Sequence, residues 1–501
     1  MDSSGKAISV LTMNTLAFVV CFACWMLNGV LVTFLIEQQV FHWSDSQIGW
    51  LIGIPVLTGA TLRLPVGVLT DKYGGRIIFA VVMLLSAIPM YLLSMATEYS
   101  HFMLCSLGFG LAGTSFAVGV AYTSVWFPKE RQGTVLGIFG AGNAGAAITS
   151  IFAPRLLRFL TDGGEQIEGW RNLPKIYAGV LVAITVLFWM FTYSRKGDTS
   201  QVKGLAERLS PLKHIRVWRF GLYYSLMFGG FVALSQWLIP YYVSAYGMTI
   251  ATAGLMASIF SLPSGVIRAL GGVLSDVWGP RRVMYLVLSS CAVCCALLIV
   301  PRMDIMSPGK GVMAKRAGTV TAIHAGEIIV DNIVHPFKTS EGQTLSDEDK
   351  NSSMLILPKA RMWQKPTVNV GDQVTKGQLL AKGETHIYFQ ANVWVFTFLL
   401  FVVGFMMGIG NAAVFRHIPD YFPREVGVVG GIVGALGALG GFFWPIFFGY
   451  MLAWTGLWTM CWVFFTILSI VCLWWMHKVI QRMLREAAPA LRVNIENAEP
   501  R

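Results

Sequence analysis

The sequence predicts an all-α membrane protein with twelve spanning helices in two related halves of six, and a small β domain inserted into the second half. Hydrophobic residues make up 55% of the 501 residues and charged residues only 13%, whereas soluble domains carry about 25% charged residues. Apolar stretches near the ~20 residues that cross a bilayer recur along the chain. The third observation is an internal repeat, in which TLRLPVGVLTDKYGGR, starting at Thr61, is nearly copied as VIRALGGVLSDVWGPR, starting at Val266.

A basic segment separates the first six apolar stretches from the last six. The predicted spans are 10–36, 46–69, 77–96, 102–126, 134–157 and 175–193, then 217–243, 250–275, 283–300, 393–415, 427–452 and 456–478. The predicted domains are an N-terminal six-helix bundle (1–193), a cytoplasmic hinge loop (194–216), a C-terminal six-helix bundle (217–301 and 392–478), an inserted β domain (302–391) and a cytoplasmic tail (479–501).

The net charge of +12 indicates membrane orientation and not nucleic-acid binding. Lysine and arginine gather in the hinge, in the tail and in alternate turns, a distribution typical of cytoplasmic loops. Both termini and the hinge are therefore predicted to be cytoplasmic, as are Arg416 and His417 at the end of the tenth span. The first apolar run is long enough to span, so no cleavable signal peptide is expected. The eight cysteines lie in apolar segments and are interpreted as packing residues, so no metal site is expected.

The position of the inserted domain follows from the spacing between the repeated motifs of the two halves. Arg63 and Arg268 are 205 residues apart, whereas the FPKE motif at Phe127 and the FPRE motif at Phe422 are 295 apart, so about 90 extra residues separate the second pair of markers. The polar segment 302–391 holds them, and its alternating β-branched residues with Gly-Asp and Lys-Gly turns predict a small β domain. Because it follows the ninth span, it is predicted to lie on the periplasmic side.

This inserted segment resembles part of the bacterial RNA polymerase beta subunit, and its VNVGDQVTKGQLL phrase resembles barrel-sandwich domains of the biotinyl and lipoyl type. The length and the membrane setting exclude a polymerase role. Neither Lys310 nor Lys315 stands in the usual acceptor context of a carrier domain. The segment is therefore expected to be a stable module with a docking or structural role.

Arg63 and Arg268 are the foremost candidate functional residues. Each lies eight residues before an aspartate of the following loop, which is about 12 Å of helix and places it near mid-membrane. An ionisable side chain at that depth is costly and is by default a functional-site candidate. Two arginines at equivalent repeat positions predict one two-fold-related site for an anion.

The motif GVLTDKYGGR at Gly67 and its echo GVLSDVWGPR at Gly272 resemble the loop between the second and third helices of the major facilitator superfamily. Asp71 and Asp276 are expected to cap a helix start, and the glycines to allow close helix packing. Two glycine-rich stretches, in the fifth and eleventh spans, are expected to let the halves slide. The residues expected to have gating or structural roles are Gly67, Asp71, Gly74, Arg76, Gly272, Asp276, Gly279, Arg281, Gly140, Gly142, Gly145, Gly434 and Gly437.

Within that superfamily the chain resembles the nitrate/nitrite porters, on the arginine pair, the GIFGAGNAGAA and GGIVGALGALGG stretches, and the phrases GLAGTSFAVG and YYSLMFGG. The resemblance covers everything except 302–391. It implies that Arg63 and Arg268 clamp a planar anion, that Phe116 and Phe228 cover its faces, and that Tyr224 and Asn143 donate hydrogen bonds. A guanidinium fork meets a flat oxyanion with paired donors. The second glycine-rich stretch has no polar residue matching Asn143.

No aspartate or glutamate lies inside the apolar cores, and proton-coupled transporters usually carry such a group. The sequence therefore predicts a nitrate/nitrite antiporter, a monomer in the bacterial inner membrane with no cofactor. The alternatives are a proton-coupled nitrate symporter and a transporter-like nitrate sensor. A membrane enzyme or electron carrier is disfavoured, because there are no paired intramembrane histidines, no P-loop and no nucleophile–base pair.

Overall fold

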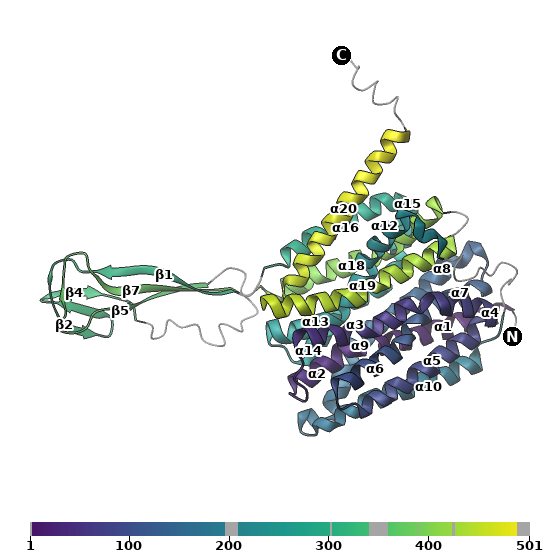
Figure 1. Cartoon of the computed structure of the whole chain (residues 1–501), viewed down its shortest axis with the longest axis horizontal. Coiled ribbons are helices and arrows are strands. Elements are labelled where there is room, and N and C mark those ends of the chain that lie inside the picture. The colour runs from purple at the N-terminus through teal and green to yellow at the C-terminus, as the bar shows by residue number, and fades with distance from the viewer. Residues whose placement is uncertain are drawn as a thin grey trace, which may run out of the picture. The chain divides into compact units, whose positions relative to one another are not determined.

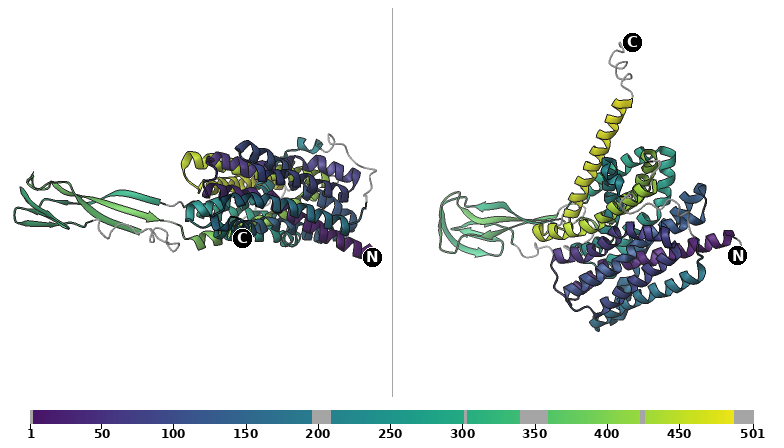
Figure 2. Two further views of the ribbon diagram at one scale, coloured as in Figure 1. Left: turned by 90° about the horizontal axis from the view of Figure 1, so that it is seen from below. Right: turned by 45° about the vertical axis from the view of Figure 1, so that its right-hand side comes forward.

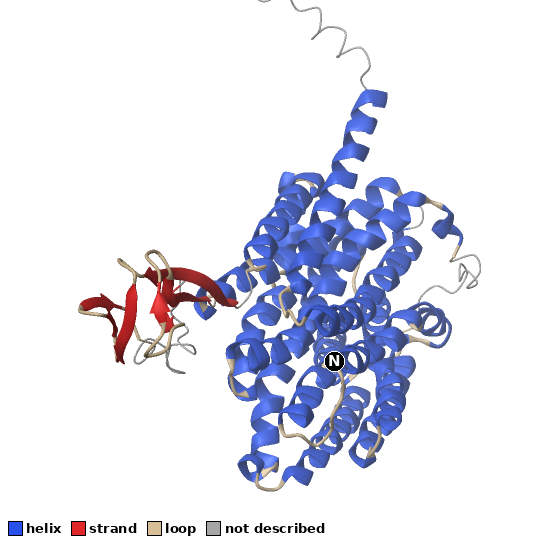
Figure 3. Ribbon diagram, turned by 60° about the vertical axis from the view of Figure 1, so that its left-hand side comes forward, coloured by secondary structure: helices blue, strands red, loops and turns tan. Residues whose placement is uncertain are grey.

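The chain forms two compact units, one of helices and one of strands (Figure 1). The computed structural model describes residues 3–195, 209–300, 303–339, 359–389, 391–422 and 426–487; most of the predicted hinge and the end of the predicted tail lie outside these ranges. The helical unit comprises Met1–Ser244, Met248–Ile299 and Thr397–Arg501, and the second unit comprises Ala245–Gly247 and Val300–Phe396. Among the described residues the strands are confined to the second unit, as the colours of Figure 3 show.

Four of the six spans of the first half are made of more than one helical segment. The six spans are α1 (Ser3–Trp25) with α2 (Leu27–Glu37), α3 (Asp45–Thr61) with α4 (Arg63–Tyr73), α5 (Gly75–Leu92), α6 (Tyr99–Phe109) with the 3-10 turn η2 (Gly110–Thr114) and α7 (Ser115–Trp126), α8 (Lys129–Gly140) with the 3-10 turn η3 (Ala141–Ala144) and α9 (Gly145–Leu160), and α10 (Asn172–Phe191).

The second half repeats this plan but ends in three uninterrupted helices. Its members are α12 (Ile215–Tyr224) with a π-helical segment η8 (Ser225–Gly229) and α13 (Gly230–Tyr246), α14 (Ile250–Val266) with α15 (Arg268–Trp278), α16 (Pro280–Leu297), α18 (Val393–Tyr421), α19 (Val426–Thr455) and α20 (Met460–Ala487). The last helix extends past 479, where the tail was predicted to begin.

Among the described residues, ten helices are long and apolar enough to cross a membrane, and two bent pairs, α3 with α4 and α14 with α15, bring the number to twelve if each pair is one span. The predicted twelve-helix architecture with a β insertion is thereby confirmed. Figure 2 shows from two further directions that the helices of this unit lie side by side along a common axis. The two halves meet where α3 packs along α19 and α14 packs along α9.

The turns after α4 and α15 use glycine for its backbone conformation. Gly74 and Gly279 have φ of 92° and 83°, and a Cβ at either position would meet nothing within 4 Å. Only glycine adopts such angles without strain. Both glycines are also the N-cap residues of the next helices. Asp71 and Asp276 lie in the last turns of α4 and α15, and their expected role at a helix start stays a prediction.

The second unit consists of two antiparallel sheets. One has the order β1 (Met303–Met313), β7 (Leu379–Phe389), β5 (Lys359–Pro366), and the other the order β4 (Ile333–Pro336), β3 (Glu327–Val330), β2 (Gly318–His324), β6 (Gln373–Val374). Alternation of side chains along the strands buries one apolar set. This core is made of Ala314, Val320, Ile328, Val330, Val368, Val374, Leu380 and Ala381.

The predicted turns of this unit are present. Gly371 and Gly377 have φ of 97° and 83°, and Asp372 accepts a hydrogen bond from the backbone N–H of Asn369 at 2.7 Å. The first strand pairs with the last from Met303 opposite Phe389 onward. The two points where the insertion leaves and rejoins the helical chain are thus held next to each other by the insertion itself.

We predict that replacing residues 302–391 with a short Gly/Ser linker leaves the helical unit folded, because the β unit has its own core and its ends lie side by side. Size-exclusion chromatography and thermal unfolding followed by circular dichroism would check this. A monodisperse protein with an unfolding midpoint close to that of the full chain is expected. Aggregation of the shortened protein would show that the helices depend on the insertion.

Candidate functional site

Arg63 and Arg268 each occupy the first residue after a break in a spanning helix. The α3 helix ends at Thr61 and α4 begins at Arg63, with a bend of 40°. The α14 helix ends at Val266 and α15 begins at Arg268, with a bend of 52° at this break. Each arginine therefore stands at the N-terminal end of a half-helix. Such ends carry a partial positive charge and face anionic substrates in transporters with broken helices.

The cause of the first break can be read from the sequence. Pro65 has no N–H to donate to the carbonyl of Thr61, so the helical ladder is interrupted there. In the second half Leu270 stands at the equivalent position, and the break instead follows Pro263 and Gly265. Two different local sequences thus produce the same interruption at equivalent positions of the repeat.

The Arg63 side chain is only 5% exposed and reaches from the first half to the second. Its Nη1 donates to the carbonyl oxygen of Gly434 in α19 at 3.0 Å. Its Cζ lies 5.8, 5.5 and 5.3 Å from the ring centroids of Trp25, Phe116 and Phe228. Nε and Nη2 are buried and have no hydrogen-bond partner among the described residues. Two donors of this guanidinium are therefore available to a ligand.

Arg268 makes the reciprocal approach from the second half. Its Cζ lies 5.3 Å from the ring centroid of Phe116 and 5.4 Å from that of Phe415. A Cβ on Gly140, at the end of α8, would lie 3.7 Å from its Cδ. Its Nη1 is buried without a partner in the described part of the chain. Both arginines thus pack on the ring of Phe116, and each reaches the glycine-rich stretch of the opposite half.

No described carboxylate forms an ion pair with either arginine. The ion pairs of the described residues join Arg171 to Glu168, Lys365 to Glu384, and Arg416 to Asp276 and Asp420. Taking charges out of water costs several kcal/mol each unless a counter-charge compensates. Two uncompensated guanidinium groups packed against one aromatic ring are an incomplete site, and an anion is the group that completes it.

The aromatic and polar candidates surround this pair. Tyr224 stacks on Phe228 with centroids 5.2 Å apart and an interplanar angle of 5°, and its buried hydroxyl has no partner among the described residues. Asn143 is 1% exposed, and its Oδ1 likewise accepts no hydrogen bond there. A Cβ on Gly265, three residues before Arg268, would lie 3.1 Å from the carbonyl carbon of Asn143. All six predicted site residues are therefore buried or half-buried around the arginines.

These six residues share a property that sequence patterns did not reveal, since each lies at or beside a non-α segment. Arg63 and Arg268 follow helix breaks, Phe116 lies two residues after the 3-10 turn η2, and Asn143 is inside the 3-10 turn η3. Tyr224 precedes the π-helical segment η8, which contains Phe228. Short 3-10 and π segments inside helices often mark hinges and functional sites, because they re-aim side chains and free backbone groups.

Two side chains of α18 were missed as candidates. Phe415 contacts Arg268 and also packs edge-on against Tyr224 at 4.8 Å. Asn411, one turn earlier on the same helix face, is 1% exposed, and neither atom of its amide group has a partner among the described residues. The sequence signal for Asn411 was present, since it is an amide in an apolar run and lies 295 residues after Phe116.

The glycines expected to gate fall into two classes. Gly142, Gly145 and Gly437 are tightly packed within one half, because a Cβ would collide with Phe18, with the Val19 backbone and with Tyr224, respectively. Gly140 and Gly434 have looser surroundings, because an added Cβ would lie 3.7 Å from Arg268 Cδ and 3.9 Å from Phe415 Cζ, respectively. Close packing thus joins the fifth span to the first and the eleventh to the seventh, inside each half.

The charged residues after the glycine motifs also act within one half. Arg76 Nη2 donates to the Trp189 carbonyl oxygen at 2.6 Å, and Arg281 Nη2 donates to the Tyr421 hydroxyl at 3.1 Å. Asp276 pairs with Arg416 at 2.6 Å. His417, predicted to lie at the cytoplasmic end of the tenth span, is 5% exposed and stacks on Phe220.

The helix pairs that join the halves have close-packed glycines at one end of the helical unit, here called the closed end. At the other end, the loose end, a Cβ added to the glycines would have no neighbours within 4 Å. At the closed end a Cβ on Gly49 would collide with the Pro445 carbonyl oxygen, one on Gly53 would lie 2.6 Å from the Phe442 carbonyl oxygen, and one on Gly254 would collide with the Ser150 carbonyl oxygen. At the opposite end, Gly67 and Gly272, one turn beyond each arginine on the same face, have nothing within 4 Å.

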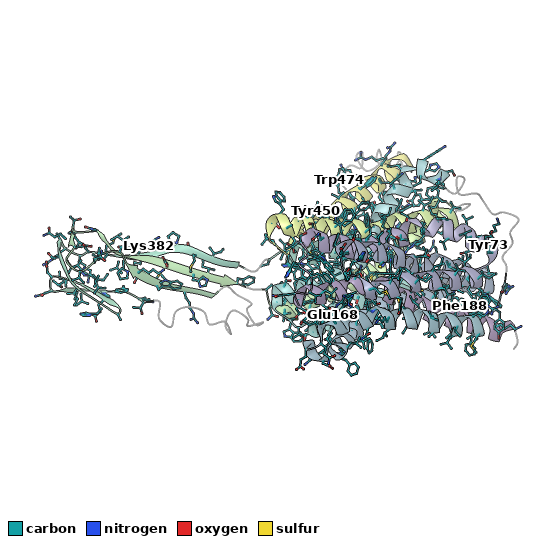
Figure 4. The ribbon with its side chains drawn as sticks, turned by 60° about the horizontal axis from the view of Figure 1, so that its bottom comes forward. Tyr73, Glu168, Phe188, Lys382, Tyr450 and Trp474 are labelled. Carbon is teal, nitrogen blue, oxygen red and sulfur yellow. The ribbon has the colours of Figure 1, made fainter. Side chains whose placement is uncertain are left out.

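Tyr450 and Tyr73, labelled in Figure 4, mark these two ends of the helical unit. Trp50 Nε1 donates to the Tyr450 hydroxyl at 3.4 Å, which adds a hydrogen bond between the halves at the closed end. At the end that carries Tyr73, a Cβ on Gly67 or on Gly272 would meet no atom within 4 Å.

A sequence profile described as Major Facilitator Superfamily matches residues 13–313 and 380–495, leaving out most of the β unit. A probable nitrate/nitrite antiporter of Thermus thermophilus is 35% identical over 493 residues, which cover 98% of this chain and 95% of that protein. A nitrite extrusion protein of Bacillus subtilis is 27% identical, covering 89% and 88%. A probable nitrate transporter of Staphylococcus epidermidis is 25% identical, covering 93% and 95%.

Solved structures with the same fold are membrane transporters of low sequence identity. A bacterial homologue of the human lysosomal transporter Spinster, inward-facing and occupied, superposes with a TM-score of 0.64 at 13% identity, covering 95% of this chain and 97% of that one. A nucleoside transporter variant gives a TM-score of 0.59 at 12% identity, covering 94% and 99%.

The asymmetric packing predicts different outcomes for two glycine substitutions. Gly53→Ala should destabilise the helical unit by about 1–3 kcal/mol, because its Cβ meets a backbone oxygen that cannot move aside. Gly67→Ala should be neutral or stabilising by up to about 1 kcal/mol, because the space is open and alanine favours the helix. Thermal unfolding in detergent measures both. Equal midpoints for the two variants would contradict the closed-end assignment.

Proposed function

The chain belongs to the major facilitator superfamily and, within it, to the nitrate/nitrite porters, and we propose that it exchanges nitrate for nitrite by alternating access at the Arg63–Arg268 site. One observation carries this proposal above the others. The guanidinium groups of Arg63, which is buried, and Arg268, which is half-buried, come from opposite halves, pack on one phenylalanine ring, keep unpartnered donors and lack any described carboxylate. Such an arrangement would bind a small anion. Because one arginine comes from each half, binding would also depend on how close the two halves are.

The surroundings favour a flat, singly charged oxyanion. Guanidinium donors lie in a plane and match two oxygens of nitrate or nitrite at once. The rings of Phe116 and Phe228 border the guanidinium of Arg63, so they would cover the faces of a planar ion. The Tyr224 hydroxyl and the Asn143 amide supply further hydrogen bonds. In the eleventh span the Gly434 carbonyl oxygen already accepts from Arg63, so that span positions the arginine through its backbone.

The same charges account for exchange instead of one-way transport. Two like unit charges that approach each other within a protein repel by a few kcal/mol at an effective dielectric constant of ~20. Closing the loose end around an empty site would bring the two arginine-bearing halves together against this repulsion. A bound monovalent anion replaces the repulsion by attraction to both arginines. The loaded carrier therefore reorients more easily than the empty one, which is the requirement for antiport.

The packing supports a mechanism in which two rigid halves rock. Tight glycine contacts of Gly142, Gly145 and Gly437 hold helices together inside each half. The helix pairs between the halves separate at the Tyr73 end and close at the Tyr450 end. Rocking would close the space beside Gly67 and Gly272 and part the contacts of Gly49 and Gly53. In the conformation with that space closed, Gly67 and Gly272 would allow the helices of the two halves to pack closely.

We propose further that the protein is a monomer in a bacterial membrane, with both termini and the hinge cytoplasmic and the inserted β domain periplasmic. The distribution of lysine and arginine supports this orientation. With this orientation the end of the helical unit that carries Tyr73, Gly67 and Gly272 is cytoplasmic.

Arg63→Lys and Arg268→Lys should each lower nitrate transport at least about tenfold, which corresponds to about 1.4 kcal/mol or more. Lysine keeps the charge but loses the planar pair of donors. Uptake of labelled nitrate into proteoliposomes is the measurement, and Arg282→Lys, on the exposed face of α16, is the matched control. Near-normal flux in either site variant would eliminate the clamp.

Nitrite-loaded proteoliposomes should take up labelled nitrate without a pH gradient, and empty ones should not. Uptake into empty vesicles driven by an inward proton gradient would make the protein a symporter. Nitrate binding with no flux under either condition would identify a sensor. Each result therefore selects one of the three mechanisms.

A further inference from the structure

A second cationic site lies in the second half, away from the Arg63–Arg268 pair. A small, partly open cavity is bounded by α12, α16, α18 and α20. Arg219 and Arg281 line it together with Tyr223, His417 and Tyr421. The wall contributed by α20 is apolar and consists of Met476, Val479 and Ile480. Charge on one side and hydrocarbon on the other give the cavity an amphipathic lining.

The positive charge of this cavity is not balanced by the described acidic groups. Arg219 is only 7% exposed, and it forms no ion pair within the described chain. Arg216 adds a third guanidinium, 5.4 Å from the ring of Tyr421. The nearby carboxylates of Asp276 and Asp420 are both engaged by Arg416, at 2.6 and 3.4 Å. A buried arginine without a counter-charge is costly unless something else supplies one.

Two buried polar groups beside the arginines are also unsatisfied. The Tyr223 hydroxyl and His417 Nδ1 have no hydrogen-bond partner among the described residues. The imidazole of His417 is held in place by stacking on Phe220, at 5.8 Å and 16°. Buried polar groups in proteins are nearly always paired, so several unpaired groups around one cavity indicate a missing ligand.

In the equivalent region of the first half, backbone carbonyl oxygens accept hydrogen bonds from Arg76 and Tyr122, and Arg76 Nε stays buried without a partner among the described residues. Arg76 matches Arg281 and Tyr122 matches His417 in the two frames of the repeat. Arg76 donates to the Trp189 carbonyl oxygen and lies 4.2 Å from the centre of the Trp189 ring. The Tyr122 hydroxyl donates to the carbonyl oxygen of Tyr193. The fold therefore does not require open, charged groups here, and the second half differs in its side chains.

We propose that this cavity binds a phosphate group, through Arg219 and Arg281 with the Tyr223 hydroxyl as a further donor. Two lining arginines from different helices and a tyrosine hydroxyl suit a tetrahedral anion with more charge and more oxygens than nitrate. The apolar α20 wall is suited to the acyl or glycerol part of an anionic lipid, whose head group and free phosphate share this chemistry. Occupancy would tie α12, α16, α18 and α20 together at one end of the second half.

The test uses the full chain in detergent with two probes, phosphatidylglycerol followed by native mass spectrometry and inorganic phosphate followed by calorimetric titration. Arg219→Gln and Arg281→Gln should each weaken binding of the effective probe about tenfold. Arg282→Gln removes the same charge from the adjacent exposed position and should leave binding unchanged. Phosphatidylcholine is the matched neutral lipid and should not bind at this site.

The outcomes separate the ligand sources and can overturn the proposal. Binding of phosphatidylglycerol that phosphate does not displace identifies a lipid head group, and binding of phosphate alone identifies a soluble ligand. Equal binding by wild type, Arg219→Gln and Arg281→Gln would refute the site, as would no binding of either probe or displacement of phosphate by nitrate at equal concentration. Because Arg219 is buried, Arg281→Gln at the exposed side still tests the site even if Arg219→Gln does not fold.

Discussion

The helical unit is organised around two guanidinium groups, one buried and one half-buried, that no described carboxylate neutralises. Arg63 and Arg268 come from opposite halves, pack on the same Phe116 ring, and each approaches the glycine-rich stretch of the other half. Bringing such charges into the membrane interior is costly, and that cost falls only when an anion lies between them. The helix breaks, the aromatic lining and the free hydrogen-bond donors all serve this arrangement.

The contacts of the glycines differ within each half and between the two halves. Within each half, glycines of the fifth and eleventh spans bring helices into contact too close for any side chain. Between the halves, close contacts occur at one end, and open space adjoins Gly67 and Gly272 at the other. Since packed interfaces deform little internally and move as units, the movement that the site requires is a rotation of one half against the other.

The two cationic sites of this chain illustrate how geometry selects an anion. The central site offers arginines against aromatic faces, which suits a planar ion of one charge. The cavity of the second half offers two arginines, a tyrosine hydroxyl without a partner among the described residues and an apolar wall, and we propose a phosphate group as its ligand. Both sites are recognised by the same physical sign, which is buried positive charge with unsatisfied hydrogen-bonding groups around it.

The class of fold, the insertion and the importance of the arginine pair follow from the sequence alone. Apolar length, the repeat offsets and an intramembrane charge are properties of short segments, so they can be recognised without a structure. Even the break before Pro65 was within reach of the sequence. The folded chain was needed to show that Arg63 meets the Gly434 carbonyl oxygen, that the Asn411 amide is buried without a partner among the described residues, and that His417 is buried. These facts depend on contacts between residues far apart in the chain, and on which face of a bent helix meets which neighbour. No periodicity or composition within one segment contains that information.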